Sequence, residues 1–159
     1  MEYEYSYRVT NIEEYINYCK KNNYKLIGIV KQTRIIYTNK NKTIARITIE
    51  DDGNITKKLD FKEDKLSKED LIVRKESAAL TFENDKDVEN ILDFLEYKKG
   101  KTIIRKRTIY EKDKVKFEID EYEKPEICFV VAIEGEKEET DLVYNELESL
   151  NKIYKEELW

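Results

Sequence analysis

Polar and apolar side chains alternate without a break over residues 2–9. The polar parity carries two acids, a serine and a base, and the other parity is aromatic or aliphatic: Glu2, Glu4, Ser6 and Arg8 against Tyr3, Tyr5, Tyr7 and Val9. A period of two places these sets on opposite faces of a β-strand. Carboxylates two positions apart on such a face are separated by roughly 7 Å, which is close enough for both to serve one divalent cation. The alternative interpretation is an acidic strand exposed to solvent, with the aromatic parity packed beneath helices.

The same period of two recurs along most of the chain and predicts an antiparallel sheet. Further strands are predicted at 25–30, 33–37, 43–50, 58–62, 71–82, 101–110, 115–121 and 127–134. Apolar residues at helical spacing predict helices after Asn11, between Asn84 and Gly100, and from about Glu138. Short turns, such as the one at 51–54, favour antiparallel pairing of consecutive strands. Because closure removes exposed edges, we expect an α+β fold with a closed sheet.

The composition is that of one soluble domain spanning residues 1–159. The chain is 40% hydrophobic and 41% charged, which is too apolar for disorder. Its formal net charge of −5 argues against a nucleic-acid or membrane-surface binder. The two cysteines, Cys19 and Cys128, lie in apolar patterns and predict core thiols in a reducing compartment. With no signal peptide and no long apolar run, we expect a cytoplasmic protein.

Charged residues of both signs recur on the polar parity of several strands. They are Glu2, Glu4, Arg8, Arg46, Lys62, Arg74, Glu76, Arg105, Arg107, Asp120 and Glu134. If the sheet closes with this parity inward, the interior suits a polyanion that binds together with a divalent cation. The sequence has no histidine, so such a metal site would use carboxylate oxygens, which favours Mg²⁺ or Mn²⁺. The alternative is a set of charged faces in solvent.

Several short motifs occur in an order that resembles a known family. After the Glu-x-Glu at Glu2 come Ala-Arg-Ile-Thr at 45–48, Leu-Asp-Phe-Lys at 59–62, Arg-x-Glu at 74–76, Arg-Lys-Arg-Thr-Ile-Tyr at 105–110, Phe-Glu-Ile-Asp at 117–120 and Phe-Val-Val-Ala-Ile-Glu at 129–134. This order resembles the CYTH family, the triphosphate tunnel proteins. The family includes class IV adenylyl cyclases, thiamine triphosphatases and inorganic triphosphatases. The resemblance implies a closed eight-stranded antiparallel β-barrel with helices packed outside.

The resemblance also implies roles for individual residues. The metal ligands would be Glu2, Glu4 and Glu134. The triphosphate would be held by basic residues of the tunnel: Arg8, Arg46, Lys62, Arg74, Arg105 and Arg107. Glu76 or Asp120 would act as the catalytic base, since no histidine is available.

The sequence departs from the family motifs at four positions. Ser6 stands where the first motif has a lysine, and Arg8 on the same parity is the candidate substitute. Thr48 replaces a second arginine, Asp60 replaces a threonine, and Ala132 replaces an acid. Each lost charge-assisted contact removes about 1.5–3 kcal/mol of ligand stabilisation.

Three functions are therefore compatible with the sequence. The first is a metal-dependent enzyme that hydrolyses a nucleoside or inorganic triphosphate, or cyclises ATP. The second is a catalytically impaired tunnel that only binds or sequesters a nucleotide or polyphosphate. The third is a structural barrel filled by salt bridges. In the first two the partner is a small molecule, and Trp159 at the chain end leaves a homodimer interface open.

Overall fold

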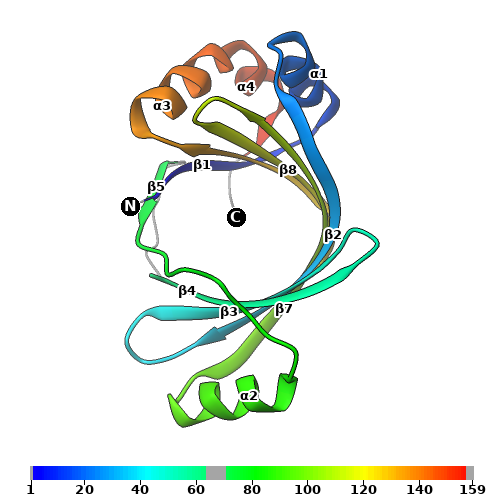
Figure 1. Ribbon diagram of the computed structural model, residues 1–159. Coiled ribbons are helices and arrows are strands. Elements are labelled where there is room, and N and C mark those ends of the chain that lie inside the picture. Colours follow the sequence, from blue (N-terminus) through cyan, green and yellow to red (C-terminus); the bar gives the residue numbers. More distant parts are fainter. Residues whose placement is uncertain (1, 64–70, 157–159) are drawn as a thin grey trace.

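The computed structural model describes residues 2–63 and 71–156; of residue 2 and residues 71–74 it describes the backbone alone. Figure 1 shows a strongly curved sheet with helices on its outer side. The elements, in chain order, are β1 (Glu2–Val9), α1 (Glu13–Lys21), β2 (Lys25–Thr38), β3 (Thr43–Asp51), β4 (Ile55–Glu63), β5 (Leu71–Arg74), β6 (Leu80–Thr81), α2 (Asp85–Phe94), β7 (Lys98–Lys112), β8 (Val115–Lys124), β9 (Cys128–Gly135), α3 (Lys137–Glu146), α4 (Glu148–Tyr154) and β10 (Lys155–Glu156).

The strands form one antiparallel sheet, which is not closed. Its order within the described residues is β10-β1-β9-β8-β7-β2-β3-β4-β6, and β5 pairs with β1 beside this path. The path has two ends, at β10 and β6. The predicted closed eight-stranded barrel is therefore wrong, whereas the α+β content, the antiparallel pairing and the external helices agree with the prediction.

Residues 71–84 explain why the sheet stays open in the described part of the chain. The pattern at 71–82 predicts one long strand, but the structure contains only the short strands β5 and β6. β5 pairs with β1, while the following residues reach β4 through an isolated bridge between Lys62 and Glu76. Backbone hydrogen bonds flank that bridge, from Glu63 to Lys75 at 3.1 Å and from Ser77 to Phe61 at 2.9 Å. No continuous ladder therefore joins β1 to β4 in the described residues.

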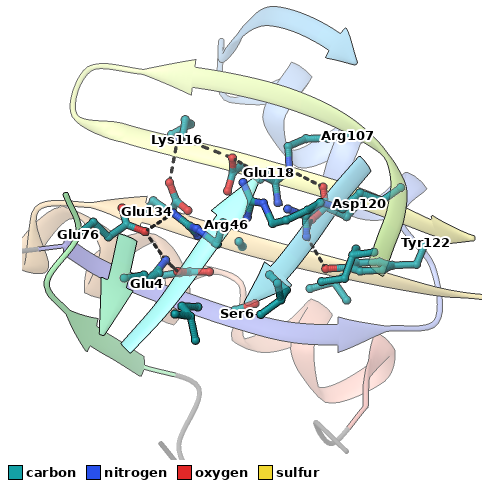
Figure 2. A pocket seen from close by; sticks show the side chains of 18 residues that line it. Glu4, Ser6, Arg46, Glu76, Arg107, Lys116, Glu118, Asp120, Tyr122 and Glu134 are labelled. Atoms are coloured by element: carbon teal, nitrogen blue, oxygen red, sulfur yellow. Dashed lines mark hydrogen bonds and ion pairs between the residues drawn. The ribbon is translucent and has the colours of Figure 1, made fainter. Parts of the chain in front are cut away.

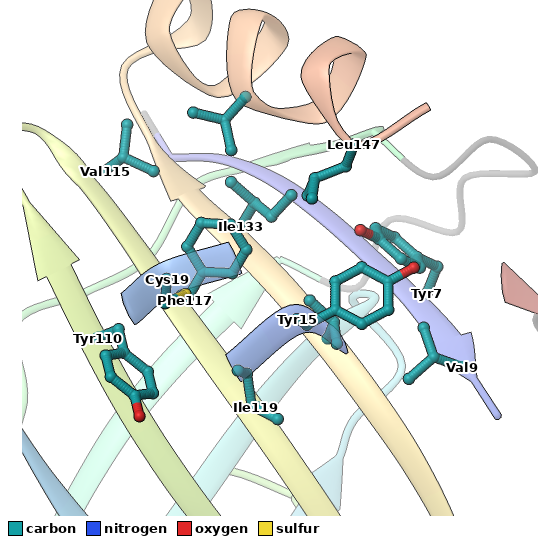
Figure 3. Packing of buried hydrophobic residues seen from close by; sticks show 12 residues of the cluster. Tyr7, Val9, Tyr15, Cys19, Tyr110, Val115, Phe117, Ile119, Ile133 and Leu147 are labelled. Atoms are coloured by element: carbon teal, nitrogen blue, oxygen red, sulfur yellow. The ribbon is translucent and has the colours of Figure 1, made fainter. Parts of the chain in front are cut away.

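Two apolar clusters cover the convex side of the sheet. The larger lies under α1, α3 and α4 and includes fully buried Tyr7, Tyr15, Phe117, Ile133 and Leu147 (Figure 3). The smaller one packs the buried residues Val88 and Leu92 of α2 against residues of β2, β3 and β4. The apolar side chains of the strands thus pack against the helices on the convex side. The polar parity consequently faces the concave side.

The ends of the helices follow local sequence signals. Asn84 caps α2, because its side chain accepts a hydrogen bond from the backbone N–H of Asp87 at 3.2 Å. Cys19 and Cys128 are both buried free thiols, as the apolar patterns predict. None of the helices described for this chain is long and apolar enough to cross a membrane.

Gly135, which ends β9, lies close to the backbone of Lys114, and a substitution tests this close approach. Its φ is +148°, and a β-carbon there would lie 2.1 Å from the carbonyl oxygen of Lys114. We expect Gly135→Ala to lower the free energy of unfolding by about 1–3 kcal/mol, because the backbone must shift. Gly28→Ala is the control, since nothing lies within 4 Å of the added atom. Urea unfolding curves with the same midpoint for both variants would contradict this expectation.

Candidate functional site

A polar cavity of about 290 Å³ lies on the concave face of the sheet. Eighteen residues from β1, β2, β3, β4, β7, β8, β9 and the segment after β5 line it (Figure 2). Six basic and five acidic side chains of the described residues take part: Arg34, Arg46, Lys62, Arg105, Arg107 and Lys116, and Glu4, Glu76, Glu118, Asp120 and Glu134. Its volume lies just below the roughly 300–1,000 Å³ that is typical of small-molecule pockets.

The cavity brings together most of the site residues predicted from the sequence. Those that line it are Glu4, Arg46, Lys62, Glu76, Arg105, Arg107, Asp120 and Glu134. Arg8 lies outside the lining, where its guanidinium contacts Glu126 and Glu156, each at 3.4 Å. Glu2 and Arg74 are paired across β1 and β5, but their side chains lie outside the described part of the structure.

The sequence interpretation missed four charged or aromatic residues of the lining: Arg34, Lys116, Glu118 and Tyr122. Three of them could have been found, because Lys116, Glu118 and Tyr122 share the parity of Asp120 on one strand. Arg34 had a weaker signal. It lies directly opposite Thr48 in the β2–β3 ladder, and that register cannot be read from β2 alone.

Arg107 is the centre of the most buried ion-pair group. Its Nε and Nη2 donate to the two carboxylate oxygens of Asp120 at 2.8 and 2.9 Å, and its Nη1 donates to Glu118 at 2.8 Å. All three residues are buried, and Asp120 is only 2% exposed. This bidentate geometry compensates the desolvation of the charges. Figure 2 shows this group on the β7–β8 side of the cavity.

A second group lies where β4 meets the segment after β5. Arg46 binds both carboxylate oxygens of Asp60 and donates to Glu76 at 3.1 Å. Lys62 contacts Glu76 at 2.5 Å and Glu4 at 3.8 Å. Asp60, the departure from the family motif, therefore neutralises an arginine that the cavity would otherwise offer to a ligand.

Two carboxyl groups meet at the end of the cavity formed by β8 and β9. Burial and the neighbouring Glu118 carboxylate raise the pKa of Glu134 to about 9, and Glu4 adds to the shift. Although burial opposes it, the Arg107 guanidinium and the hydrogen bond with Glu134 hold the pKa of Glu118 well below its usual range. A raised pKa on Glu134 beside a lowered pKa on Glu118 is the pattern of two carboxyl groups that share one proton. Lys116 also lies 3.0 Å from Glu134.

The acids of the cavity are paired with bases rather than gathered around a common point. In the described part of the chain, no three acidic or cysteine side chains form a group that could hold a metal ion. Glu4 is engaged by Lys62, Glu134 by Lys116 and Glu118 by Arg107. The donor chemistry suits a hard cation, but these carboxylates would have to release their basic partners to bind one.

The other end of the cavity is rich in arginine. Arg105 donates from Nε to Gln32 and from Nη1 to the Tyr122 hydroxyl, both at 2.7 Å, and its Nη1 lies 3.7 Å from Asp120. Arg34 donates from Nε to the Thr48 hydroxyl at 3.1 Å. At this end of the cavity the guanidinium groups are thus held mainly by neutral oxygens, whereas the bases near Glu4, Glu118 and Glu134 are paired with carboxylates.

Removal of Arg107 tests the buried ion pairs. We expect Arg107→Ala to lower the free energy of unfolding by about 3–5 kcal/mol, because it leaves two buried carboxylates without their partner. The control is Lys106→Ala on the same strand, whose ion pair with Glu121 is exposed and contributes about 0–1 kcal/mol. Equal losses of stability in chemical denaturation would contradict the assignment.

The shared proton predicts a pH dependence. The folded pKa of Glu134 lies above its unfolded value of about 4.3. Its contribution to stability is therefore complete below that value and is lost as the pH rises through about 9. Glu134→Gln keeps a neutral donor at every pH.

We expect the free energy of unfolding of Glu134→Gln, taken relative to that of the wild-type chain, to increase by roughly 1–3 kcal/mol between pH 5 and pH 8. Urea unfolding curves recorded in the presence of EDTA measure this difference in free energy, and Glu121→Gln is the control. Parallel pH profiles for Glu134→Gln and the wild-type chain would disprove the shared proton.

The fold of this chain is similar to those of known proteins, although no family model and no curated protein matches its sequence. A protein from Pyrococcus horikoshii aligns with a TM-score of 0.73 at 18% identity, over 96% of this chain and 88% of that one. HpAC1 from Hippeastrum, a proposed adenylyl cyclase with a dominant triphosphatase activity, aligns with a TM-score of 0.69 at 15% identity, over 98% and 90% of the two chains.

A proposed adenylate cyclase from Bacillus halodurans also aligns, with a TM-score of 0.63 at 13% identity, over 98% of this chain and 92% of that one. At such identities the likeness concerns the fold alone. The resemblance to the triphosphate tunnel proteins that the motifs carry is therefore confirmed at the level of the fold.

Proposed function

We propose that the chain binds a small-molecule triphosphate in the cavity and hydrolyses it with the help of Mg²⁺ or Mn²⁺. The observation that carries the proposal is the lining itself, in which six basic and five acidic side chains of the described residues share one small cavity. A polyanion bound with a divalent cation matches both signs of charge. The triphosphatase activity of HpAC1, which has a similar fold, makes hydrolysis the first reaction to test. Cyclisation of ATP is the second.

The basic residues would hold the phosphate oxygens. Arg46, Lys62, Arg105 and Arg107 have the donors for this role, and all four are buried in the lining. A polyphosphate competes for them with Asp60, Glu76, Glu118 and Asp120. Arg74 is proposed for the same role from the sequence alone. Arg8 could join only by exchanging its contacts with Glu126 and Glu156.

For the cation we propose Glu4 and Glu134, with Glu2 on the same parity, as the ligands. Carboxylate oxygens are the donors that Mg²⁺ and Mn²⁺ prefer. The proton shared by Glu118 and Glu134 supports this location, because it marks a place where two carboxylates require a positive charge between them. A bound divalent cation would supply neutralisation of phosphate charge there.

Glu76 and Asp120 are the proposed bases for activating water. Asp120 is only 2% exposed and is held by Arg107, whereas Glu76 contacts Lys62 and Arg46 at the more open side of the cavity. If phosphate oxygens take over the basic partners, either carboxylate gains a free lone pair for a proton. Glu76 is the easier of the two to reach from solvent.

A binding-only tunnel is the second candidate, and the small residues of the lining favour it. Ser6 and Ala132 both face the cavity and lie opposite each other in the β1–β9 ladder. Neither supplies the charge that the corresponding family motif provides. A site with these two charges missing could retain phosphate affinity and still lack the machinery for turnover.

Phosphate release distinguishes the two candidates. We expect turnover of tripolyphosphate, ATP or thiamine triphosphate with Mg²⁺ or Mn²⁺, and a loss of at least about tenfold in Glu4→Gln, which removes one carboxylate charge. Glu121→Gln, a half-buried acid outside the cavity, is the matched control. Chromatography of the ATP reaction would detect a cyclic product. Binding of these compounds without any turnover would reject the hydrolase and support the tunnel that only binds.

A further inference from the structure

Arg34 differs from every other basic side chain that lines the cavity in the described part of the chain. Arg46, Lys62, Arg105, Arg107 and Lys116 each have a carboxylate partner. Arg34 has no ion pair with any described carboxylate, and its guanidinium is held only by the Thr48 hydroxyl through Nε. Both of its Nη atoms are therefore left for another acceptor.

The surroundings of Arg34 are unfavourable for a cation. It lines the cavity together with the guanidinium groups of Arg105, Arg46 and Arg107. Burial and these three neighbouring positive charges lower the pKa of Arg34 to about 9. A cation placed among cations, with a neutral hydroxyl as its partner, destabilises the empty cavity. A bound anion would remove this repulsion.

Arg105 supplies a second, independent observation. The residue is 4% exposed, and its Nη2 is buried without a hydrogen-bond partner. The other two nitrogens are fixed by the neutral oxygens of Gln32 and Tyr122. A buried donor without a partner costs about 1–3 kcal/mol, so the orphaned nitrogen itself indicates a missing acceptor.

We propose that Arg34 and the Nη2 atom of Arg105 form a phosphate-binding subsite that works without a metal ion. Guanidinium donors match the oxygens of a phosphoryl group. The subsite lies toward the Tyr122 end of β8: Tyr122, which holds Arg105, is four residues along this strand from Glu118, or roughly 13 Å of extended strand. The carboxylate partner of Arg105 is Asp120, at 3.7 Å. The inference rests on the proposed function only in taking the phosphoryl group to be part of a triphosphate.

This subsite also accounts for one departure from the family motifs. Thr48 stands on β3 where the motif has an arginine, and Arg34 lies directly opposite it on β2 with a hydrogen bond between the two side chains. The missing positive charge is thus supplied by the neighbouring strand. Thr48 then acts as a positioning residue for Arg34.

Calorimetric titration with tripolyphosphate and with inorganic phosphate, in EDTA and in a buffer free of sulfate and phosphate, tests the subsite. We expect the wild-type chain to bind tripolyphosphate without metal and Arg34→Gln to bind it about 10- to 100-fold more weakly. Arg34→Lys, which keeps the charge, should bind with intermediate affinity. Lys31→Gln is the matched control, because Lys31 is an exposed base on the same strand and should change the affinity less than twofold.

Thermal unfolding in the absence of phosphate separates binding from a structural role. Since Arg34 is repelled by its neighbours, Arg34→Gln should melt at the same temperature as the wild-type chain or higher, and tripolyphosphate should no longer stabilise it. If Arg34→Gln fails to fold, the measurement is made on Arg34→Lys: a tripolyphosphate affinity below that of the wild-type chain supports the subsite, and wild-type affinity in that variant counts against it.

Three results would overturn the subsite: no metal-free binding by the wild-type chain, equal affinity of Arg34→Gln, or equal weakening in Lys31→Gln. The last result would show that only the summed charge attracts the ligand. These outcomes are separate from those of the phosphate-release assay. Metal-free binding that depends on Arg34, in a protein with no turnover, would support the subsite and reject the hydrolase.

Discussion

The structure depends on compensating the charges that line a cavity largely withdrawn from water. An isolated buried charge is costly, whereas a hydrogen-bonded pair can be held at little net cost. The apolar side chains of the strands pack against helices, and the alternating polar side chains therefore face the concave side. Bidentate pairs such as Arg107 with Asp120 then make that face stable. Arg34 and the proton between Glu118 and Glu134 are the places where compensation is incomplete, and both are where we locate ligands.

Strand alternation was sufficient to predict the antiparallel sheet and the side of the sheet on which charges gather. It could not predict closure, because closure depends on whether 71–82 pairs along its whole length with both neighbours. The same limit applies to β2, which the pattern divides at Lys31-Gln32 but which continues unbroken from Lys25 to Thr38. Local alternation reports which face a residue occupies. It does not report how long a ladder continues.

The candidate site was predictable in the same measure. Residues predicted from a motif or from their face of a strand, such as Glu4, Arg105 and Asp120, do line the cavity. Their partners were not predictable, because an ion pair is decided by register between strands that are distant in sequence. In the sequence Asp60 is only a departure from a motif, whereas in the structure the β3–β4 ladder places it opposite Arg46. Arg8 shows the converse, since its parity is right while its position near the end of β1 directs it to Glu126 and Glu156.

The pairing of Arg46 with Asp60 has a consequence for how this lining can diverge between related proteins. A change of Arg46 alone leaves Asp60 without its bidentate partner, and a change of Asp60 alone leaves the buried Arg46 with Glu76 only, so the two positions are constrained to change together. A charge can also be transferred from one strand to its neighbour at a paired position, as Thr48 and Arg34 illustrate. Divergence by such coupled steps alters the linear motifs while the summed charge of the lining is preserved. Covariation between facing strands, rather than identity within a motif, is therefore the signal by which relatives of this chain should be sought.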